Sequence, residues 1–187
     1  KTVGIPIPPN LIVAGTVNMD ETTHGFSRKV IDRALTIDFG AFFPNQLEEY
    51  FVPTTTPIAL SFPVLSRVNQ DDLAGVVADN NGKKSIAFLE SINDILGGTP
   101  FELAYRALNE LLISVVCFKP KDELELYAVW DDFLMTKVFP RLEGDSQKLK
   151  QETIDNQQVN LLTKLQTLVQ ASFKTDTIKD RPDLLRV

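Results

Sequence analysis

The sequence predicts a mainly α-helical protein that begins with a small α/β part. Between residues 10 and 39, an apolar run rich in β-branched side chains precedes a short helical pattern and a second apolar stretch. From about residue 82 onward, apolar residues recur instead at helical spacing. The stretch between these patterns is rich in Thr and Pro, and proline disfavours long helices. We therefore expect an α/β segment at 1–40, a connector at 41–81 and a helical domain at 82–187.

The first segment has the pattern of one strand–helix–strand step of a parallel sheet. Leu11 to Ala14 form a continuous apolar run, which is typical of a strand buried on both faces. Ser27 is a suitable N-cap for a short helix at about residues 28–34, and a second apolar run extends from Leu35 to Phe39. One such step cannot form a sheet alone. The other strands must come from sequence outside this chain, or this edge is poorly ordered.

The second half of the sequence predicts a bundle of four amphipathic helices. The first of them should end at Gly97-Gly98, the second begin near Pro100 and the third end near Pro140. Within the connector, we expect only short helices near residues 45–51 and 70–78. The four predicted apolar faces consist of Ile86, Leu89, Ile92 and Leu96; of Ala104, Leu108, Leu111, Leu112 and Val115; of Leu126, Trp130, Phe133, Leu134 and Val138; and of Leu161, Leu162, Leu165, Leu168 and Val169.

The composition is that of an ordinary soluble globular protein, with 43% hydrophobic and 24% charged residues. No apolar run approaches the roughly 20 residues of a membrane-spanning helix, so we expect no membrane contact. The single cysteine, Cys117, excludes an internal disulfide and lies among apolar residues, which predicts a buried, inert thiol. Because no export signal is present at the N-terminus, we expect a cytoplasmic protein.

The charge pattern argues against two classes of site. The net charge is −6, and tight nucleic-acid binding needs a basic surface, so this part should not contact nucleic acid directly. His24 is the only histidine and has no partners at metal-ligand spacing, so we expect no metal site. An acidic run is most simply a solvated helix face with first-turn dipole partners; it comprises Asp122, Glu123, Glu125, Asp131 and Asp132.

Three polar residues follow the first predicted strand and helix. Asn18 and Asp20 come just after the strand, where open parallel sheets bind ligands. An asparagine there can hold a water in line with a terminal phosphate. Arg33 ends the following helix, where a guanidinium can reach a phosphate held by a neighbouring molecule.

These residues resemble the McrB-type branch of the AAA+ NTPases, the motor subunits of modification-dependent restriction systems. The resemblance is carried by the strand NLIVAGTVN, the acidic turn DETT and the segment FSRKVIDRA. It implies that Asn18 is the sensor-1 residue and Asp20 a nucleotide-binding residue. Arg33 would be the arginine finger that acts across a subunit boundary, with Arg28 as a second candidate.

The resemblance extends to two segments of the predicted helical domain. One of them, FELAYRALNELL, is similar to the family's lid helix, which makes Arg106 a sensor-2-like residue, and the other, WDDFLMTKVFPRLEGD, is similar to a later lid segment.

The resemblance implies a partial AAA+ α/β core followed by a helical lid, as the C-terminal portion of a motor. It implies ATP or GTP with Mg²⁺ as the cofactor of the full-length protein, a homo-oligomeric ring, a nuclease subunit as a partner, and DNA contacted through other regions. Family members that use GTP have an Asn-Thr-Ala-Asp turn, whereas this sequence has Asn18-Met19-Asp20-Glu21, so both nucleotides remain open. No G-x-x-x-x-G-K-[ST] phosphate loop occurs in the chain, so we expect this part alone to be inactive.

Simpler interpretations of the same residues stay open at this stage. Asn18 could close a turn, and Arg33 could pair with Asp32 or cap a helix. Arg106 has the spacing of a surface salt-bridge ladder with Glu102 and Glu110. The chain as a whole would then be a non-catalytic helical protein-interaction module.

Overall fold

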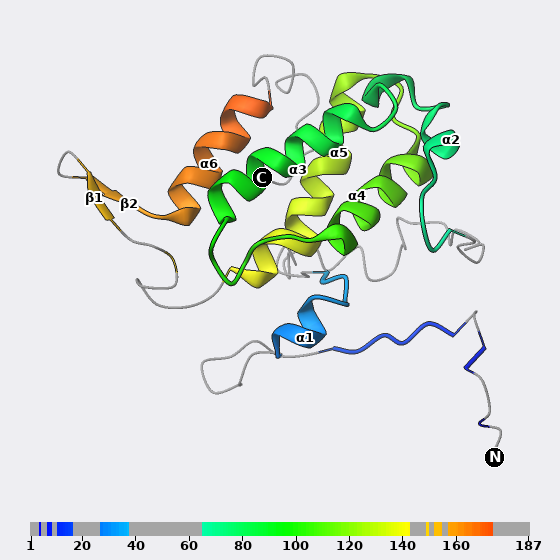
Figure 1. Cartoon of the computed structure of the whole chain (residues 1–187), viewed down its shortest axis with the longest axis horizontal. Helices are drawn as coiled ribbons and strands as arrows, with labels where there is room; N and C mark the ends of the chain where they lie inside the picture. Colours follow the sequence, from blue (N-terminus) through cyan, green and yellow to red (C-terminus); the bar gives the residue numbers. More distant parts are fainter. Residues whose placement is uncertain are drawn as a thin grey trace, which may run out of the picture.

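The computed structural model describes residues 4, 7, 8, 11–16, 27–37, 65–142, 149, 152–154 and 157–173 of the chain. Figure 1 shows helices gathered in one body, with residues 11–16 and α1 (blue) beneath it. The elements follow in the order α1 (Arg28–Ile31), α2 (Gln70–Leu73), the 3₁₀-helix η2 (Val77–Asp79), α3 (Lys83–Leu96), α4 (Tyr105–Phe118), α5 (Glu123–Phe133), the π-helix η3 (Leu134–Val138), the 3₁₀-helix η4 (Phe139–Arg141), β1 (Glu152–Ile154), β2 (Gln157–Val159) and α6 (Leu161–Ser172).

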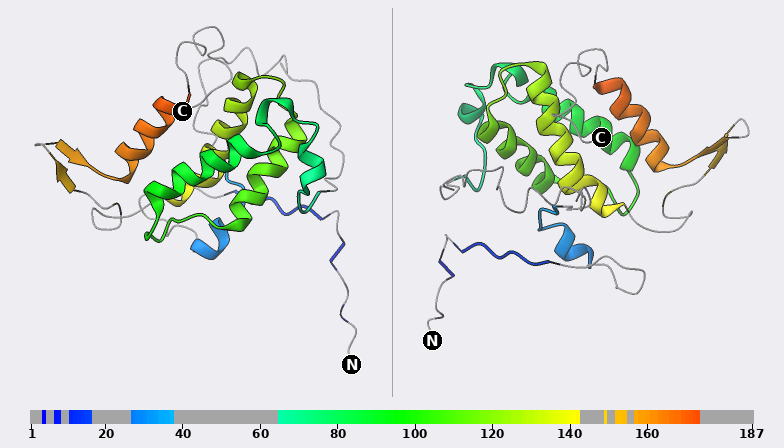
Figure 2. Two further views of the ribbon diagram at one scale, coloured as in Figure 1. Left: turned by 45° about the horizontal axis from the view of Figure 1, so that its top comes forward. Right: turned by 180° about the vertical axis from the view of Figure 1, so that it is seen from behind.

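The four long helices α3, α4, α5 and α6 bury apolar faces in one core, which confirms the prediction of a mainly helical protein. Helix α6 lies along α3, and α4 lies along α5 (Figure 2). Burying one leucine or isoleucine side chain contributes about 1.5–3 kcal/mol, so this core stabilises the fold. No described helix is long and apolar enough to cross a membrane. The side chains with almost no exposure include Ile92, Leu96, Leu111, Leu126, Leu134, Leu161 and Leu165.

The core also includes residues that precede position 82. Helices α2 and η2 occupy the region that was predicted to be helical near residues 70–78, and Leu73, Val76 and Ala78 are buried. Asn109 on α4 fixes the segment before them: its side chain accepts from the N–H of Val68 (3.1 Å) and donates to the carbonyl of Ser66 (3.0 Å). Residues 65–79 therefore pack with the bundle. The helix predicted near residues 45–51 lies outside the described residues.

Helix α4 begins at Tyr105, later than the predicted start near Pro100. The side chain of Asn93 holds the link before it out of helical geometry, because it donates to the Leu103 carbonyl (2.9 Å) and accepts from the Leu103 N–H (2.9 Å). Ala104 is consequently exposed, and Ala107 takes the inward position. Leu162, in the first turn of α6, is also exposed rather than part of the core.

The predicted strand–helix–strand step is not seen in the described residues. Residues 11–16 and 34–37 have no regular secondary structure, and α1 ends at Ile31 instead of near residue 34. A strand needs hydrogen-bonding partners on a neighbouring strand, and no described strand pairs with these residues. The strands that are described, β1 and β2, form a separate antiparallel hairpin in which Thr153 lies opposite Gln158. The apolar side chains of Leu11, Ile12 and Val13 are 56%, 71% and 86% exposed.

Two single-residue predictions about helix faces are wrong. Cys117 is exposed rather than buried, because Leu111 and Val115 face the core and position 117 lies on the opposite side of α4. Asp131 is buried rather than solvated, because α5 contacts both α4 and η2 and has little free surface. The start of the same acidic run behaves as predicted: Asp122 is the N-cap of α5, and its side chain accepts from the Glu125 N–H.

A buried carboxylate joins η2 to α3 and α5. Asp79 is fully buried, and its Oδ1 accepts from the N–H of Ser85 (2.8 Å), a first-turn donor of α3. The Ser85 hydroxyl accepts from Trp130 Nε1 (2.8 Å). Burial raises the pKa of the Asp79 carboxyl above its ordinary value of 3.8, and hydrogen bonds from Ser85 and the charge of Lys84 oppose this only in part. The network therefore places an acid of raised pKa in the core.

Replacing Asp79 with asparagine should change how stability depends on pH. With a raised folded-state pKa, the contribution of Asp79 is full below 3.8 and is lost as the pH rises through the folded-state pKa. Asparagine keeps an oxygen acceptor for the Ser85 N–H and carries no charge. Urea unfolding just above pH 3.8 and at neutral pH should show the variant gaining stability relative to the wild type as pH rises. A difference that stays constant over this range would contradict the assignment.

Candidate functional site

Residues 32–36 contact the helical bundle through a buried lysine. The side chain of Lys137, on η3, is only 1% exposed, and its Nζ lies 2.7 Å from Glu110 Oε2 on α4. The same Nζ donates to the main-chain carbonyls of Asp32 (3.1 Å) and Ala34 (3.0 Å). A lysine ammonium has three N–H donors. The ammonium therefore donates hydrogen bonds to two carbonyls and forms an ion pair with one carboxylate, and we refer to this cluster as the Lys137 clasp.

Two further contacts flank the Lys137 clasp. Arg141 Nη2 on η4 lies 3.1 Å from Asp32 Oδ1, and the arginine side chain is mostly buried. The Thr36 N–H donates to the Thr136 carbonyl (3.1 Å). Figure 2 shows α1 beneath the end of the bundle, and α1 contacts η4. Side-chain and main-chain bonds thus fix the segment after α1 to one end of the bundle.

The local sequence explains why the Thr136 carbonyl is available to accept a hydrogen bond from the Thr36 N–H. The Thr136 carbonyl would pair with the N–H of residue 140 in a regular α-helix, but Pro140 has no N–H. At this point α5 passes into the π-helix η3, a rare form that often occurs at functional sites. Lys137 shares η3 with Leu134 and Val138, which are both buried. Its aliphatic side chain is buried as well, and its ammonium lies beside the Glu110 carboxylate.

Arg33, the predicted arginine finger, lies between the two carbonyls that the clasp binds. Its side chain is exposed and forms no ion pair within the described part of the chain. Its N–H donates to the Val30 carbonyl (2.9 Å). Asp32, its neighbour, pairs with Arg141, so the simpler pairing of Arg33 with Asp32 is not the one that forms.

The other predicted site residues are only partly covered. Asn18 and Asp20 lie outside the described residues, as does His24, and only the backbone of Arg28 is described, at the start of α1. Arg106 is exposed in the first turn of α4. The ladder proposed around it does not form in the described residues, because Glu110 pairs with Lys137 and Glu102, which precedes α4, accepts from the Gly98 N–H. No group of three or more potential metal ligands occurs in the described ranges.

Sequence reasoning missed Lys137, Glu110 and Arg141. A signal was present: Lys137 is the only charged residue in the run LMTKVF, and a charge inside an apolar helical run is rarely left buried without a partner. What the sequence did not provide was the identity of the partners. Two of the three partners are main-chain carbonyls more than 100 positions away, and no pattern in the sequence marks the residues to which they belong.

A family model places the bundle among known sequences. A family described as a domain of unknown function (DUF8727) matches residues 63–181, more than half of the chain. The chain belongs to this family. No curated protein and no solved structure matches it. The DUF8727 match contains Glu110, Lys137 and Arg141, whereas Asp32 and Ala34 precede it. The Lys137 clasp therefore links the DUF8727 domain to a segment outside it.

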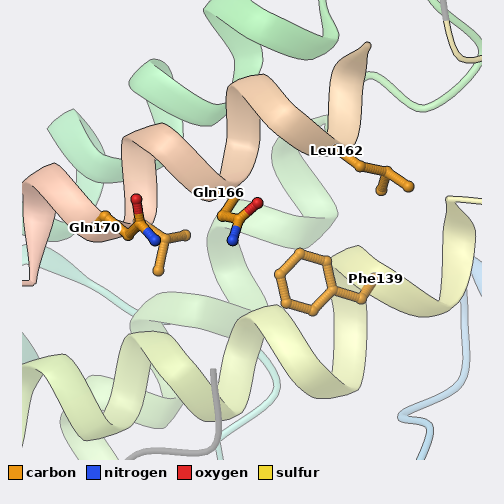
Figure 3. A pocket seen from close by; sticks show the side chains of 5 residues that line it. Phe139, Leu162, Gln166 and Gln170 are labelled. Atoms are coloured by element: carbon orange, nitrogen blue, oxygen red, sulfur yellow. The ribbon is translucent and has the colours of Figure 1, made fainter. Parts of the chain in front are cut away.

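A groove lies between α6 and η4 of the DUF8727 domain. It has a volume of about 300 Å³ and is lined mainly by apolar atoms. Figure 3 shows Phe139 on one wall, facing Gln166 and Gln170 across the groove. The groove holds no charged residue among its lining side chains, which are those of Phe139, Leu162, Gln166, Val169 and Gln170. Its lining therefore offers apolar surface together with the amide groups of Gln166 and Gln170.

Proposed function

We propose that this chain is the C-terminal portion of an AAA+ NTP-driven motor of the McrB type. In this proposal, residues 10–39 complete the α/β core, and the DUF8727 domain is the helical lid over the nucleotide. Asn18 orients the attacking water, Asp20 lies near the nucleotide, and Arg33 acts on the nucleotide of the adjacent subunit, with Arg28 as the alternative finger. Arg106 is the lid residue that senses the phosphates.

The observation that carries this proposal is the exposure of an apolar, β-branched segment. Leu11, Ile12 and Val13 expose more than half of their side chains, and Leu35 and Ile37 also expose about two thirds. Burying such side chains contributes roughly 1.5–3 kcal/mol each, so a segment of this composition favours a covered position. Neighbouring strands of a parallel sheet are the cover that suits it. In the proposed motor, those strands come from the remainder of the α/β core.

The charge and position of Arg33 support the same proposal. An arginine finger must lie on the surface of its own subunit to reach a neighbour, and Arg33 is exposed without an ion pair in the described residues. The parent would be a cytoplasmic homo-oligomeric ring using ATP or GTP with Mg²⁺. Its lid motion would drive work on DNA held by other regions, in concert with a nuclease subunit.

The apolar groove favours one competing function, a non-catalytic helical module that binds a protein. The residues encoded before Lys1 in the gene separate the two functions. A G-x-x-x-x-G-K-[ST] loop within about 200 residues upstream, the size of one core domain, supports the motor. Its absence from that region supports the binding module.

Replacing Asn18 with alanine in the complete protein should lower the NTP turnover number by about 100-fold, because one aligned hydrogen-bonding group at the reacting water is lost. The measurement is steady-state phosphate release with ATP and with GTP. Gln166→Ala, which removes an exposed amide from the groove, is the matched control and should leave turnover unchanged. Wild-type turnover in the Asn18 variant would contradict the sensor-1 role of Asn18, and unchanged turnover in both Asn18→Ala and Arg33→Ala would remove the assignment of these residues.

A further inference from the structure

The stability of the bundle alone does not require the Lys137 clasp. Transferring a lysine ammonium from water to a site with 1% exposure carries a desolvation penalty that its attraction to Glu110 must offset. An apolar residue of similar length would fill the space between Leu134 and Val138 without that cost. The bonds that an apolar residue cannot make are those to the carbonyls of Asp32 and Ala34.

These two carbonyls lie on either side of Arg33. Holding both fixes the main chain before and after this residue, and the Arg33 N–H is fixed as well by the Val30 carbonyl. The adjoining bonds of Asp32 to Arg141 and of Thr36 to Thr136 anchor the same segment on both sides. The main chain is therefore hydrogen-bonded at Asp32, Arg33 and Ala34, while the Arg33 side chain is exposed to solvent.

We infer that Lys137 is a positioning residue that holds Arg33 in place for the active site of the adjacent subunit, with Glu110 orienting the lysine. The inference rests on the proposed motor function, since Arg33 acts there as the finger. It adds a direct link between lid and finger: Glu110 lies on α4, one turn after Arg106, and pairs with the lysine that binds the finger segment. Lid movement on α4 is thus transmitted to the backbone around Arg33.

The test uses Lys137→Met in the complete protein, because methionine keeps the length and apolar stem and removes the donors. The turnover number should fall by about 10- to 100-fold, as expected when a catalytic group is misplaced by about 1 Å. The KM for NTP should change much less, because the lysine does not touch nucleotide. Lys83→Met, an exposed lysine on α3, is the matched control and should leave both constants unchanged.

The second readout distinguishes positioning from simple stabilisation. If Lys137 acts through Arg33, then Lys137→Met should lower turnover no further in a protein that already carries Arg33→Ala. Hydrogen exchange of the Thr36 backbone amide should be faster in Lys137→Met, because its hydrogen bond to the Thr136 carbonyl requires that residues 32–36 stay packed on the bundle. An additive effect in the double variant, or unchanged turnover in a variant whose Thr36 exchanges faster, overturns the inference.

A third variant tests the inference if Lys137→Met fails to fold. Glu110→Gln keeps an oxygen acceptor beside the ammonium and the packing of α4, and it removes the charge with which Lys137 pairs. It should reduce turnover in the same direction when turnover is measured well below the melting temperature of the variant, since loss of the ion pair also lowers stability. Loss of turnover in Arg33→Ala together with normal turnover in both clasp variants rejects the inference alone. Normal turnover in Arg33→Ala rejects the finger role of Arg33 and the inference together, whereas absence of NTP turnover in the complete wild-type protein rejects the motor function.

Discussion

Replacing Arg33 with alanine in the complete protein should lower the NTP turnover number by about 10³-fold while NTP binding stays nearly intact. An arginine supplied by a neighbouring subunit contacts the transferred phosphoryl group as charge develops on it, so its removal affects the transition state more than the bound substrate. The measurement is the turnover number with nucleotide affinity determined separately by equilibrium binding.

The control for this variant is Arg67→Ala, which removes an exposed arginine outside the proposed site. Mixing provides the sharper test: subunits with intact Arg33 but no functional phosphate loop should restore turnover to Arg33→Ala subunits in shared rings. Equal loss of binding and turnover in Arg33→Ala would show a structural role instead. Failure of mixing to restore activity would place the arginine in its own subunit's site.

Replacing Trp130 with alanine should lower the free energy of unfolding by about 4 kcal/mol. Trp130 stacks on Phe88, with ring centroids 4.4 Å apart and planes 6° apart, and contacts Tyr127 at 5.6 Å. Its Nε1 also donates to the buried Ser85 hydroxyl, which links α5 to the first turn of α3. The substitution therefore leaves a cavity at the junction of two core helices and breaks this link.

Trp130→Phe separates the two contributions, since it keeps an aromatic ring beside Phe88 and loses the hydrogen bond to Ser85. This variant should lose about 1–2 kcal/mol. Because Trp130 is the only tryptophan, unfolding must be followed by circular dichroism rather than by tryptophan fluorescence. Equal losses in the two variants would mean that stacking contributes little and that the hydrogen bond dominates.

Helical periodicity predicted the bundle well because apolar spacing along one helix is a local property. Leu126, Trp130 and Val138 were predicted to face the core and are buried. The errors came from interactions between distant residues. Asn93 delays the start of α4 through its bonds to Leu103, and no pattern within α4 itself signals this. The strand pattern at residues 11–14 is equally local, but a strand forms only where another strand is available to pair with it.

The candidate site was predictable only in its side-chain chemistry. Arg33 is exposed and Asn18 and Asp20 lie outside the described residues, so the roles of all three stay predictions. The Lys137 clasp was not predictable, because a carbonyl group occurs at every position and nothing in the sequence distinguishes those of Asp32 and Ala34. The charged residue within an apolar run indicated that a partner exists, without indicating where.

Recognition of main-chain oxygens by Lys137 has a consequence for sequence change. Every amino acid has the same main-chain carbonyl, so substitutions at position 34 can accumulate without removing the oxygen to which Lys137 donates. Pairwise covariation between these positions would therefore be weak even though the atoms are 3.0 Å apart. Tolerance of substitution at position 34, together with intolerance at position 137, is the evolutionary signature that this geometry leaves.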